Sequence, residues 1–198
     1  NLSFLNHLMK KIIAGVDEVG RGSLIGPVYA AAVILNKNIN KNKLKDSKIL
    51  SKINRKILEK YIKKNSIWAI GSASLIEIEK LNILNASLLA MKRAIKKLKK
   101  KPQLVLVDGN KIPLINYYKI KSVIKGDQKI PEISAASIIA KVSRDRLITK
   151  MSKKFNRYSW DKNAGYGTKE HISAIKKFGI TRHHRKTFQP IHNILSPK

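Results

Sequence analysis

The sequence predicts an α/β fold built on a mixed sheet, and three observations support that prediction. Apolar, β-branched runs of strand length come first, helical patterns then alternate with further strand-like runs, and glycine, proline or polar stretches separate most of these segments. The 198 residues, of which 43% are hydrophobic, suffice for one core. We therefore expect one folded domain and exclude a wholly disordered basic chain.

The first half of the chain predicts three strands and one helix. The short apolar runs that predict the strands are residues 12–16, 23–35 and 67–75. Polar residues fill a loop at 36–43. Asp46 and Ser47 then provide a candidate N-cap for a helix that extends to Lys64.

The second half predicts two more strands and three more helices. The strands are residues 104–108 and 121–127, and the helices are residues 76–100, 131–155 and 169–179. Pro102 ends the first of these helices, Pro131 starts the second and Gly179 caps the third. This alternation of strands and helices favours a sheet that helices cover.

The composition is strongly basic. Lys and Arg total 42 and Asp and Glu total 12, which gives a formal net charge of +30. This charge favours a polyanionic partner such as nucleic acid. Only eight of the cations are arginines, the better bidentate phosphate ligands, so a diffuse lysine surplus from AT-rich codons is the alternative explanation. The absence of cysteine excludes zinc fingers and disulfide-stabilised domains.

The N-terminal segment predicts neither export nor membrane insertion. No apolar run reaches transmembrane length, and NLSFLNHLMKK lacks the features of a secretory signal. We expect a cytoplasmic protein without membrane contact. Residues 1–11 are expected to form a flexible lead-in, with Met9 as a candidate start, before a domain at 12–198.

Four of the acidic residues lie where strands are predicted to end. Asp17 and Glu18 directly follow the first apolar run, Asp108 ends LVLVD, and Asp127 ends SVIKGD. Such strand ends line the ligand-binding crevice of α/β folds, and unpaired carboxylates are costly to bury there. Converging carboxylates repel unless a divalent cation neutralises them, and oxygen ligands alone suit Mg²⁺ or Mn²⁺. The four acids therefore predict a divalent metal site.

Other interpretations of these residues stay open. Asp108 with Gly109 is also a common turn dipeptide. Neighbouring residues of a strand point to opposite faces, so Asp17 and Glu18 share a site only if the strand bends or ends there. The acids expected on solvated helix faces are Glu59, Glu77, Glu79 and Glu170. The histidines that could be ligands, bases or ordinary packing residues are His171, His183 and His184.

Two glycine-containing segments are candidates for substrate binding. Gly20, Arg21 and Gly22 allow a backbone to approach a ligand closely, so main-chain groups could bind a sugar hydroxyl while Arg21 reaches phosphate. Glycines also bracket Tyr166, whose ring could stack on a base or sugar. A flexible turn and a tyrosine packed on the body of the domain are the alternatives.

Together these segments resemble bacterial ribonuclease HII, of the type 2 ribonuclease H family. The most specific matches are GVDEVGRGSLIGPVYAAAVIL (15–35) and VIKGDQKIPEISAASIIAKVSRDR (123–146). The other matching stretches are LKDSKILS (44–51), LNILNASLLAMKRAI (81–95), LVLVDGN (104–110), GYGTKEH (165–171) and HRKTFQP (184–190). They cover nearly the whole chain in the family's order.

The resemblance implies a ribonuclease H-like fold, a five-stranded mixed sheet flanked by helices, with a small helical, substrate-contacting part at roughly 150–198. The acids that it implies as catalytic and metal-binding are Asp17, Glu18, Asp108 and Asp127. The residues that it implies in substrate binding are Gly20, Arg21, Gly22, Lys48 and Tyr166. The implied cofactor is Mn²⁺ or Mg²⁺ in a two-metal mechanism, in which the second ion could arrive with the substrate.

The implied activity is endonucleolytic cleavage of the RNA strand of RNA–DNA hybrids and of single ribonucleotides within duplex DNA. Cleavage on the 5′ side of the ribonucleotide would leave 3′-hydroxyl and 5′-phosphate ends, as ribonucleotide excision repair and DNA replication require. We expect a monomer, and the lack of a clamp-binding tail after Pro190 argues against a sliding-clamp contact. The alternatives are a non-catalytic, RNA-associated basic protein and another nuclease on the same fold, such as a resolvase or exonuclease.

Overall fold

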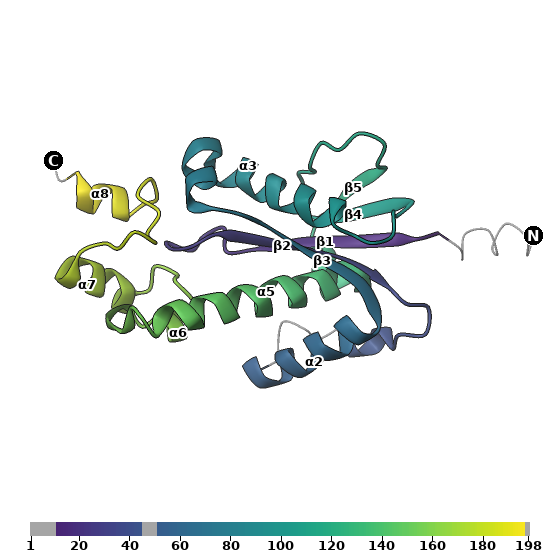
Figure 1. The fold of residues 1–198 in the computed structure, drawn as a ribbon, viewed down its shortest axis with the longest axis horizontal. Helices are drawn as coiled ribbons and strands as arrows, with labels where there is room; N and C mark the ends of the chain where they lie inside the picture. The colour runs from purple at the N-terminus through teal and green to yellow at the C-terminus, as the bar shows by residue number, and fades with distance from the viewer. Residues whose placement is uncertain (1–10, 45–50, 197–198) are drawn as a thin grey trace, which may run out of the picture.

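Five strands form one mixed sheet in the computed structural model, which describes residues 11–44 and 51–196 (Figure 1). The strands are β1 (Ile13–Val19), β2 (Val28–Leu35), β3 (Ser66–Ala73), β4 (Leu104–Asp108) and β5 (Ile120–Val123). Their order is β3-β2-β1-β4-β5, in which β2 is antiparallel to β1 and β3, while β4 is parallel to β1 and β5. The predicted α/β class and five-stranded mixed sheet are confirmed.

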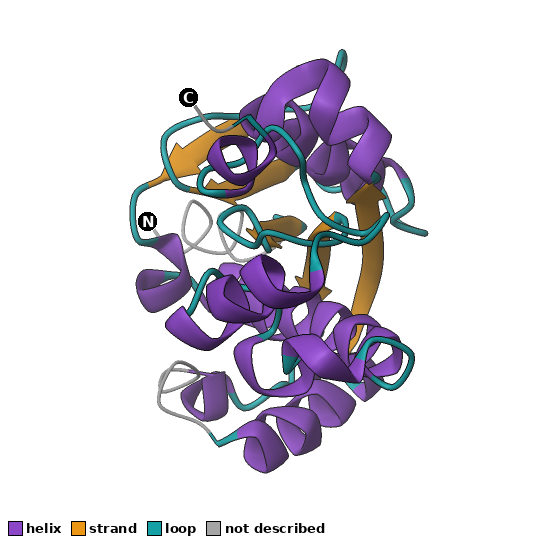
Figure 2. Ribbon diagram, turned by 90° about the vertical axis from the view of Figure 1, so that its left-hand side faces the viewer, coloured by secondary structure: helices purple, strands orange, loops and turns teal. Residues whose placement is uncertain are grey.

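Helices cover both faces of this sheet. The α-helices are α2 (Lys52–Lys64), α3 (Leu75–Lys96), α4 (Gly126–Lys129), α5 (Pro131–Ser152), α6 (Trp160–Asn163), α7 (Lys169–Phe178) and α8 (Ile191–Leu195), and two 3₁₀ turns are η1 (Lys41–Leu44) and η2 (Asn156–Tyr158). Helix α3 packs on one face, and α5 with α2 on the other (Figure 1). Seen from the end that carries the C-terminal helices, the strands lie between these two layers (Figure 2).

Two glycines bring the helices close to the strands. A Cβ atom at Gly15 of β1 would collide with the backbone of α5 at Glu132 and Ile133. A Cβ at Gly71 of β3 would collide with the backbone of α3 at Ala90. Side chains of any size at these positions would lift the helices away from the sheet.

The capping signals define where the long helices begin. Ser74 caps α3, because its side chain accepts a hydrogen bond from the Glu77 backbone N–H. The Glu77 carboxylate in turn accepts a hydrogen bond from the Ser74 backbone N–H, and the two bonds form a capping box. Pro131 occupies the first turn of α5, as predicted. Helix α2 begins at Lys52 with Ser51 as its cap, so the helix start predicted at Asp46 and Ser47, which lie outside the described residues, is not where α2 begins.

Three expectations for the acidic residues are wrong. Strand β1 continues through Asp17 and Glu18 because its ladder with β2 extends to Val19. Strand β5 ends at Val123, and Asp127 lies in α4 instead of at a strand end. Glu59 is buried, not solvated, and its carboxylate pairs with Lys63 and Arg146. In each case a tertiary contact decides what the local pattern leaves open.

The C-terminal third forms a second, smaller core against the loop that precedes β2. The buried side chains of this cluster include Leu24, Ile25, Ile148, Trp160, Ile175 and Ile191. Helix α8, which the sequence analysis did not assign, contributes through Ile191. Isolated bridges join Ser23 to Tyr166 and Ile25 to His184. Within residues 11–44 and 51–196, no helix combines the length and apolar character needed to cross a bilayer.

Candidate active site

The parallel strands bring the predicted acids to one edge of the sheet. In the β1–β4 ladder Val16 pairs with Val107, so the next step of the register places Asp17 beside Asp108. Strand β5 lies on the other side of β4, and the chain leaving it enters α4, which carries Asp127. The backbones of the three segments therefore end at a common edge.

Asp17 is the most perturbed carboxyl group at this edge. It is 7% exposed and accepts a hydrogen bond of 2.7 Å from the Glu18 backbone N–H, with Ser137 of α5 as a further hydrogen-bond partner. Burial, with added repulsion from the Glu18 and Asp108 carboxylates, raises the pKa of Asp17 to about 8. Ionisation of Asp17 is therefore unfavourable, because no positively charged group among the causes of this shift compensates the carboxylate.

Glu18 lies on the opposite side of the strand pleat from Asp17. Its Oε1 pairs at 3.2 Å with Nη1 of Arg21, whose side chain is half exposed. Burial raises the pKa of Glu18, and Arg21 opposes that shift while Asp108 adds to it. Glu18 thus lies in the electrostatic field of the same edge, but in this structure it is bound to Arg21.

The backbone of α4 holds the Asp108 side chain in place. Oδ1 of Asp108 accepts a hydrogen bond of 2.7 Å from the Gly126 N–H and a longer one of 3.4 Å from the Asp127 N–H. A Cβ atom at Gly126 would lie 3.3 Å from Oδ1 of Asp108 and 3.2 Å from Cβ of Val123, so glycine leaves room for the close approach of this turn to Asp108. The N–H groups at the start of α4 thereby fix the orientation of Oδ1 of Asp108.

The donor set at this edge fits a hard divalent cation that completes its shell from solvent and substrate. No three His, Cys, Asp or Glu side chains in the described part of the chain converge into a ready-made ligand group. Mg²⁺-type sites commonly use one or two carboxylates plus waters and phosphate oxygens. Buried Asp17 beside Asp108 meets that requirement, whereas a preassembled four-carboxylate cluster, as the sequence analysis expected, is not present in these side-chain positions.

The Gly20–Gly22 turn lies beside Tyr166. Gly20 has φ +92°, and the Ser23 N–H donates to its carbonyl at 3.4 Å, while Arg21 and Gly22 are exposed. A Cβ atom on Gly22 would lie 3.7 Å from Cε1 of Tyr166. The Tyr166 side chain is half-buried, and its backbone bridges to Ser23. Two segments far apart in sequence therefore form one surface next to Asp17.

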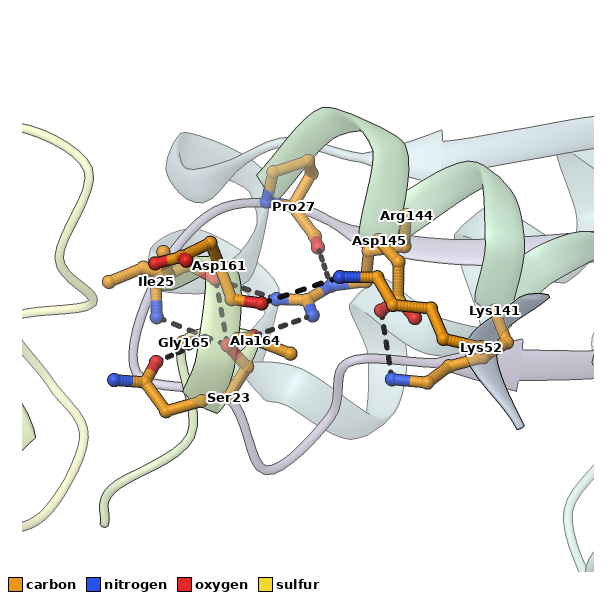
Figure 3. Close-up of polar contacts among 11 residues, drawn as sticks. Ser23, Ile25, Pro27, Lys52, Lys141, Arg144, Asp145, Asp161, Ala164 and Gly165 are labelled. Atoms are coloured by element: carbon orange, nitrogen blue, oxygen red, sulfur yellow. Dashed lines mark hydrogen bonds and ion pairs between the residues drawn. The ribbon is translucent and has the colours of Figure 1, made fainter. Parts of the chain in front are cut away.

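Two fully buried arginines fix this surface, and the sequence analysis missed both. Arg144 of α5 donates to the carbonyls of Pro27, Ile25 and Ala164 at 3.2, 3.0 and 3.1 Å (Figure 3). Arg185 donates to the carbonyls of Gly26 and Arg21 at 3.0 and 2.8 Å. Burial lowers the pKa of both groups, that of Arg185 to about 9, so Arg185 remains charged at neutral pH.

No local signal distinguishes these arginines from surface ones. Arg144 lies in the quoted stretch KVSRDR and Arg185 in HRKTFQP, but each stretch contains other basic residues. Gly20 offers the one indirect sign, because a Cβ atom there would collide with the Arg144 guanidinium. The buried side chains of Arg144 and Arg185, from α5 and the C-terminal segment, therefore fix the Gly20–Gly22 turn and the residues that follow it.

The candidate histidines belong to the C-terminal core. Nε2 of His171 accepts from the Trp160 indole N–H at 2.9 Å, and its Nδ1 lies 2.9 Å from the Tyr166 carbonyl, which requires the proton on Nδ1. Nδ1 of His184 accepts from the Thr181 N–H at 2.8 Å, and its Nε2 lies 3.3 Å from that of His171. Burial lowers the pKa of both, that of His184 to about 4. Both rings pack inside the C-terminal core, as one of the three interpretations of the histidines held.

Lys48, the remaining predicted substrate-binding residue, lies outside the described residues. The described part of the candidate site therefore comprises the carboxylates of β1, β4 and α4, the Gly20–Gly22 turn and Tyr166. The arginines beneath that turn complete it.

Comparison with known proteins yields a consistent set of relatives. The family model described as Ribonuclease HII matches residues 14–191. A ribonuclease HII of Pelagibacter ubique is 75% identical over 93% of this chain and 100% of its own, and one of Neisseria meningitidis serogroup B is 45% identical over 95% and 97%. The crystal structure of ribonuclease H2 from Pyrococcus horikoshii OT3 superimposes with a TM-score of 0.77 at 27% identity, over 92% of this chain and 96% of that one.

Proposed function

The chain belongs to the ribonuclease HII family and is an endonuclease, and on that premise we propose that it cleaves the RNA strand of RNA–DNA hybrids and single ribonucleotides embedded in duplex DNA. Cleavage falls on the 5′ side of the ribonucleotide and leaves 3′-hydroxyl and 5′-phosphate ends. The observation that supports this proposal best is the buried Asp17 carboxyl group beside Asp108, next to an exposed glycine turn.

Asp17, Glu18, Asp108 and Asp127 are the proposed holders of Mn²⁺ or Mg²⁺. When bound, the two ions supply an activated water and stabilise the leaving 3′ oxygen. Asp17 contributes a carboxylate whose ionisation is unfavourable until positive charge arrives. Asp108 has Oδ1 fixed by the Gly126 amide and its other oxygen available for an ion.

The Gly20–Gly22 turn is proposed to recognise the ribose. A 2′-hydroxyl is the group that distinguishes RNA from DNA locally, and main-chain groups can bind it without reading the base. Arg21 is proposed to contact a phosphate of the substrate. This contact would replace the ion pair that Arg21 makes with Glu18 in the free protein. Tyr166 is proposed to stack on the neighbouring sugar, and its position close to Gly22 supports this role, since a Cβ atom on Gly22 would lie 3.7 Å from its ring.

Lys48 is proposed to contact a phosphate of the same substrate. The protein is proposed to act as a monomer in the cytoplasm, in ribonucleotide excision repair and DNA replication, without a sliding-clamp contact. Its formal charge of +30 supports association with any nucleic acid duplex through counterion release.

One assay tests the central proposal. A labelled DNA duplex with a single ribonucleotide and an all-DNA duplex are incubated with the protein and Mn²⁺, Mg²⁺ or a chelator. We expect one nick on the 5′ side of the ribonucleotide, only with metal and only in the first duplex. Asp108→Asn should lower the rate by more than about 100-fold, beyond the usual effect of an outer-shell change, while duplex binding persists. Cleavage of the all-DNA duplex, or turnover in the chelator, would refute the proposal.

A further inference from the structure

A basic groove runs between α2 and α5, away from the acidic edge. It encloses about 290 Å³, and the cations that line it are Lys52, Arg55, Lys56, Arg146, Lys150 and Lys153. Most of these side chains are exposed, and Val142 contributes apolar surface. Helix α2 lies along α5 in this region (Figure 1), so both walls of the groove are rigid helices.

The charge of the groove is nearly all of one sign. Asp145 is the one acid among its lining residues, and Lys141 already binds it at 2.8 Å. Two of the eight arginines of the chain, Arg55 and Arg146, line this groove, and Arg146 also pairs with Glu59 of α2 at 3.0 Å. Closely spaced cations on two facing helices repel one another, and a polyanion between them relieves that repulsion.

A second hollow connects this groove to the candidate active site. It encloses about 140 Å³ and shares Lys52, Arg55, Asp145 and Thr149 with the first. Its other wall includes Lys141 and Ala164 (Figure 3). The Lys141 ammonium lies 6.0 Å from the centre of the Tyr166 ring, and Ala164 lies two residues before that tyrosine. Cationic side chains therefore line both hollows from near Tyr166 to the far end of α5, and Asp145 and Asp161 are the acids among their lining residues.

The geometry of α5 sets the reach of this surface. Ser137 bonds Asp17 at one end, and Thr149 and Lys153 line the groove 12 and 16 residues further along the chain. At a rise of 1.5 Å per residue these positions lie about 18 to 24 Å from the Asp17 level. Duplex DNA advances about 3.4 Å per base pair, so the same span corresponds to roughly five to seven base pairs.

We propose that the α2–α5 groove binds the phosphodiester backbone of the duplex about five to seven base pairs from the scissile bond. The inference rests on the proposed function, because it takes the substrate to be a duplex engaged at the Asp17 edge. The groove contributes affinity and register but no base readout, since cations on phosphate carry no sequence information. Substrates with a short arm on that side fail to fill it.

The test compares two variants of equal charge. The groove variant carries Lys56→Gln, Lys150→Gln and Lys153→Gln, and the control carries Lys96→Gln, Lys97→Gln and Lys99→Gln near the end of α3, on the other face of the sheet. Binding to ribonucleotide-containing duplexes is measured in a chelator across a salt series. Three duplexes are compared. The first has twelve base pairs on each side of the ribonucleotide, and each of the other two has one of these arms shortened to four base pairs. Melting temperatures check that both variants fold.

For the long duplex we expect the groove variant to bind about tenfold more weakly and its salt slope to fall by up to about 2.7, at about 0.9 per lost phosphate contact. The control should change by less than half of that. Shortening one of the two arms should remove the difference between wild type and groove variant. With metal, KM should rise while kcat stays unchanged.

Two results would overturn the inference while leaving the proposed function intact. One is equal weakening by groove and control variants, which would indicate diffuse charge. The other is a defect that persists whichever arm is shortened. If wild-type protein fails to nick the ribonucleotide duplex at all, the proposed function itself is wrong, whatever the groove binds.

Discussion

At the scale of single residues, the burial of Asp17 lowers the stability of the folded state. Its carboxyl group is buried beside two other carboxylates, and its pKa rises to about 8 for that reason. Glu59 shows the opposite arrangement. It is equally buried, yet hydrogen bonds and ion pairs from Lys63 and Arg146 outweigh the effect of burial and lower its pKa. A buried acid with cationic partners is structural, whereas one with anionic neighbours indicates a site that awaits a cation.

This difference predicts that Asp17→Asn stabilises the metal-free protein. At neutral pH the buried carboxyl group, with a pKa of about 8, must take up a proton on folding, whereas an amide of the same shape needs none. We expect the melting temperature at neutral pH to rise, by about 2–4 °C for each kcal/mol gained at this chain length. Thermal denaturation in a chelator measures it.

The same experiment with millimolar Mn²⁺ provides the functional contrast. The ion should raise the melting temperature of the wild type, because it binds the folded state only, and should raise that of Asp17→Asn much less. Asp161→Asn, at an exposed acid of α6, is the matched control and should behave as wild type. A destabilised Asp17→Asn that still responds fully to Mn²⁺ would contradict this account.

At the scale of structural elements, the loop between β1 and β2 has little regular structure of its own. Its backbone carbonyls are instead bound by Arg144 and Arg185, which reach it from α5 and from the segment before α8. Nη2 of Arg185 is buried without a hydrogen-bond partner among the described residues, so the guanidinium group of Arg185 uses only part of its hydrogen-bonding capacity. The conformation of the Gly20–Gly22 turn therefore depends on elements distant in sequence.

Arg185→Lys should loosen this turn without removing charge. A lysine ammonium cannot replace the fixed guanidinium fork that binds two carbonyls, and each buried acceptor left unpaired costs about 1–3 kcal/mol. We expect the melting temperature to fall by roughly 2–10 °C. We also expect the kcat/KM for a single embedded ribonucleotide to fall more than that for a long hybrid. Arg182→Lys, at an exposed neighbour, is the control, and an equal response of both variants would show that the fork is dispensable.

The histidine pair predicts acid sensitivity of the C-terminal elements. The unfolded chain protonates histidine near pH 6.5, whereas burial lowers the pKa of His184 in the fold to about 4, with a smaller contribution from the neighbouring His171 ring. The unfolded state thus binds more protons within this window, and the free energy of unfolding decreases as the pH falls from about 6.5 to about 4.

Denaturant unfolding across that pH range measures the effect. His184→Gln should be less stable at neutral pH but should lose less stability on acidification than the wild type. His192→Gln, at an exposed histidine of α8, should keep the wild-type slope. Parallel pH profiles for the wild type and His184→Gln would rule out the proposed linkage.

At the scale of the whole molecule, the site lies between two cores. The main core joins the sheet to α3 and α5, and the smaller one joins α6, α7 and α8 to Leu24 and Ile25. Tyr166 lies in the loop between α6 and α7, two helices of the second core, and Gly22 lies in the loop after β1. The backbone bridge from Ser23 to Tyr166 joins the two loops. The proposed reading of an RNA–DNA junction, in which Tyr166 stacks on the sugar next to the ribonucleotide, therefore depends on how the C-terminal third packs against the β1–β2 loop.

Tyr166→Ala tests this docking in function. Loss of a stacking ring worth about 1–3 kcal/mol should reduce cleavage at a single ribonucleotide by roughly 10- to 100-fold, and cleavage of a long hybrid less. Tyr117→Ala, at a ring that is 92% exposed, is the control and should leave both rates unchanged. Rates on the two substrates are compared under single-turnover conditions, and equal losses on both would argue against junction reading.

The sequence alone located most of the long elements and identified which acids to examine at the edge of the sheet. The run LVLVD forms a strand with the predicted limits, Leu104–Asp108, because an apolar β-branched segment between proline and glycine has few other stable states. Periodicity likewise located α5 and α7 to within a few residues. Acids at the ends of apolar runs were recognisable because charge is disfavoured there whatever the partners.

Only the tertiary structure decided which charged groups are buried and what they contact. Asp17 and Glu18 lie inside β1 because β2 pairs with them, and Arg144 and Arg185 are structural because unpaired carbonyls of a distant loop surround them. Glu59 is buried because α5 brings Arg146 against α2. A residue's type limits its chemistry locally, but its burial and its partners depend on segments that meet only in the folded chain.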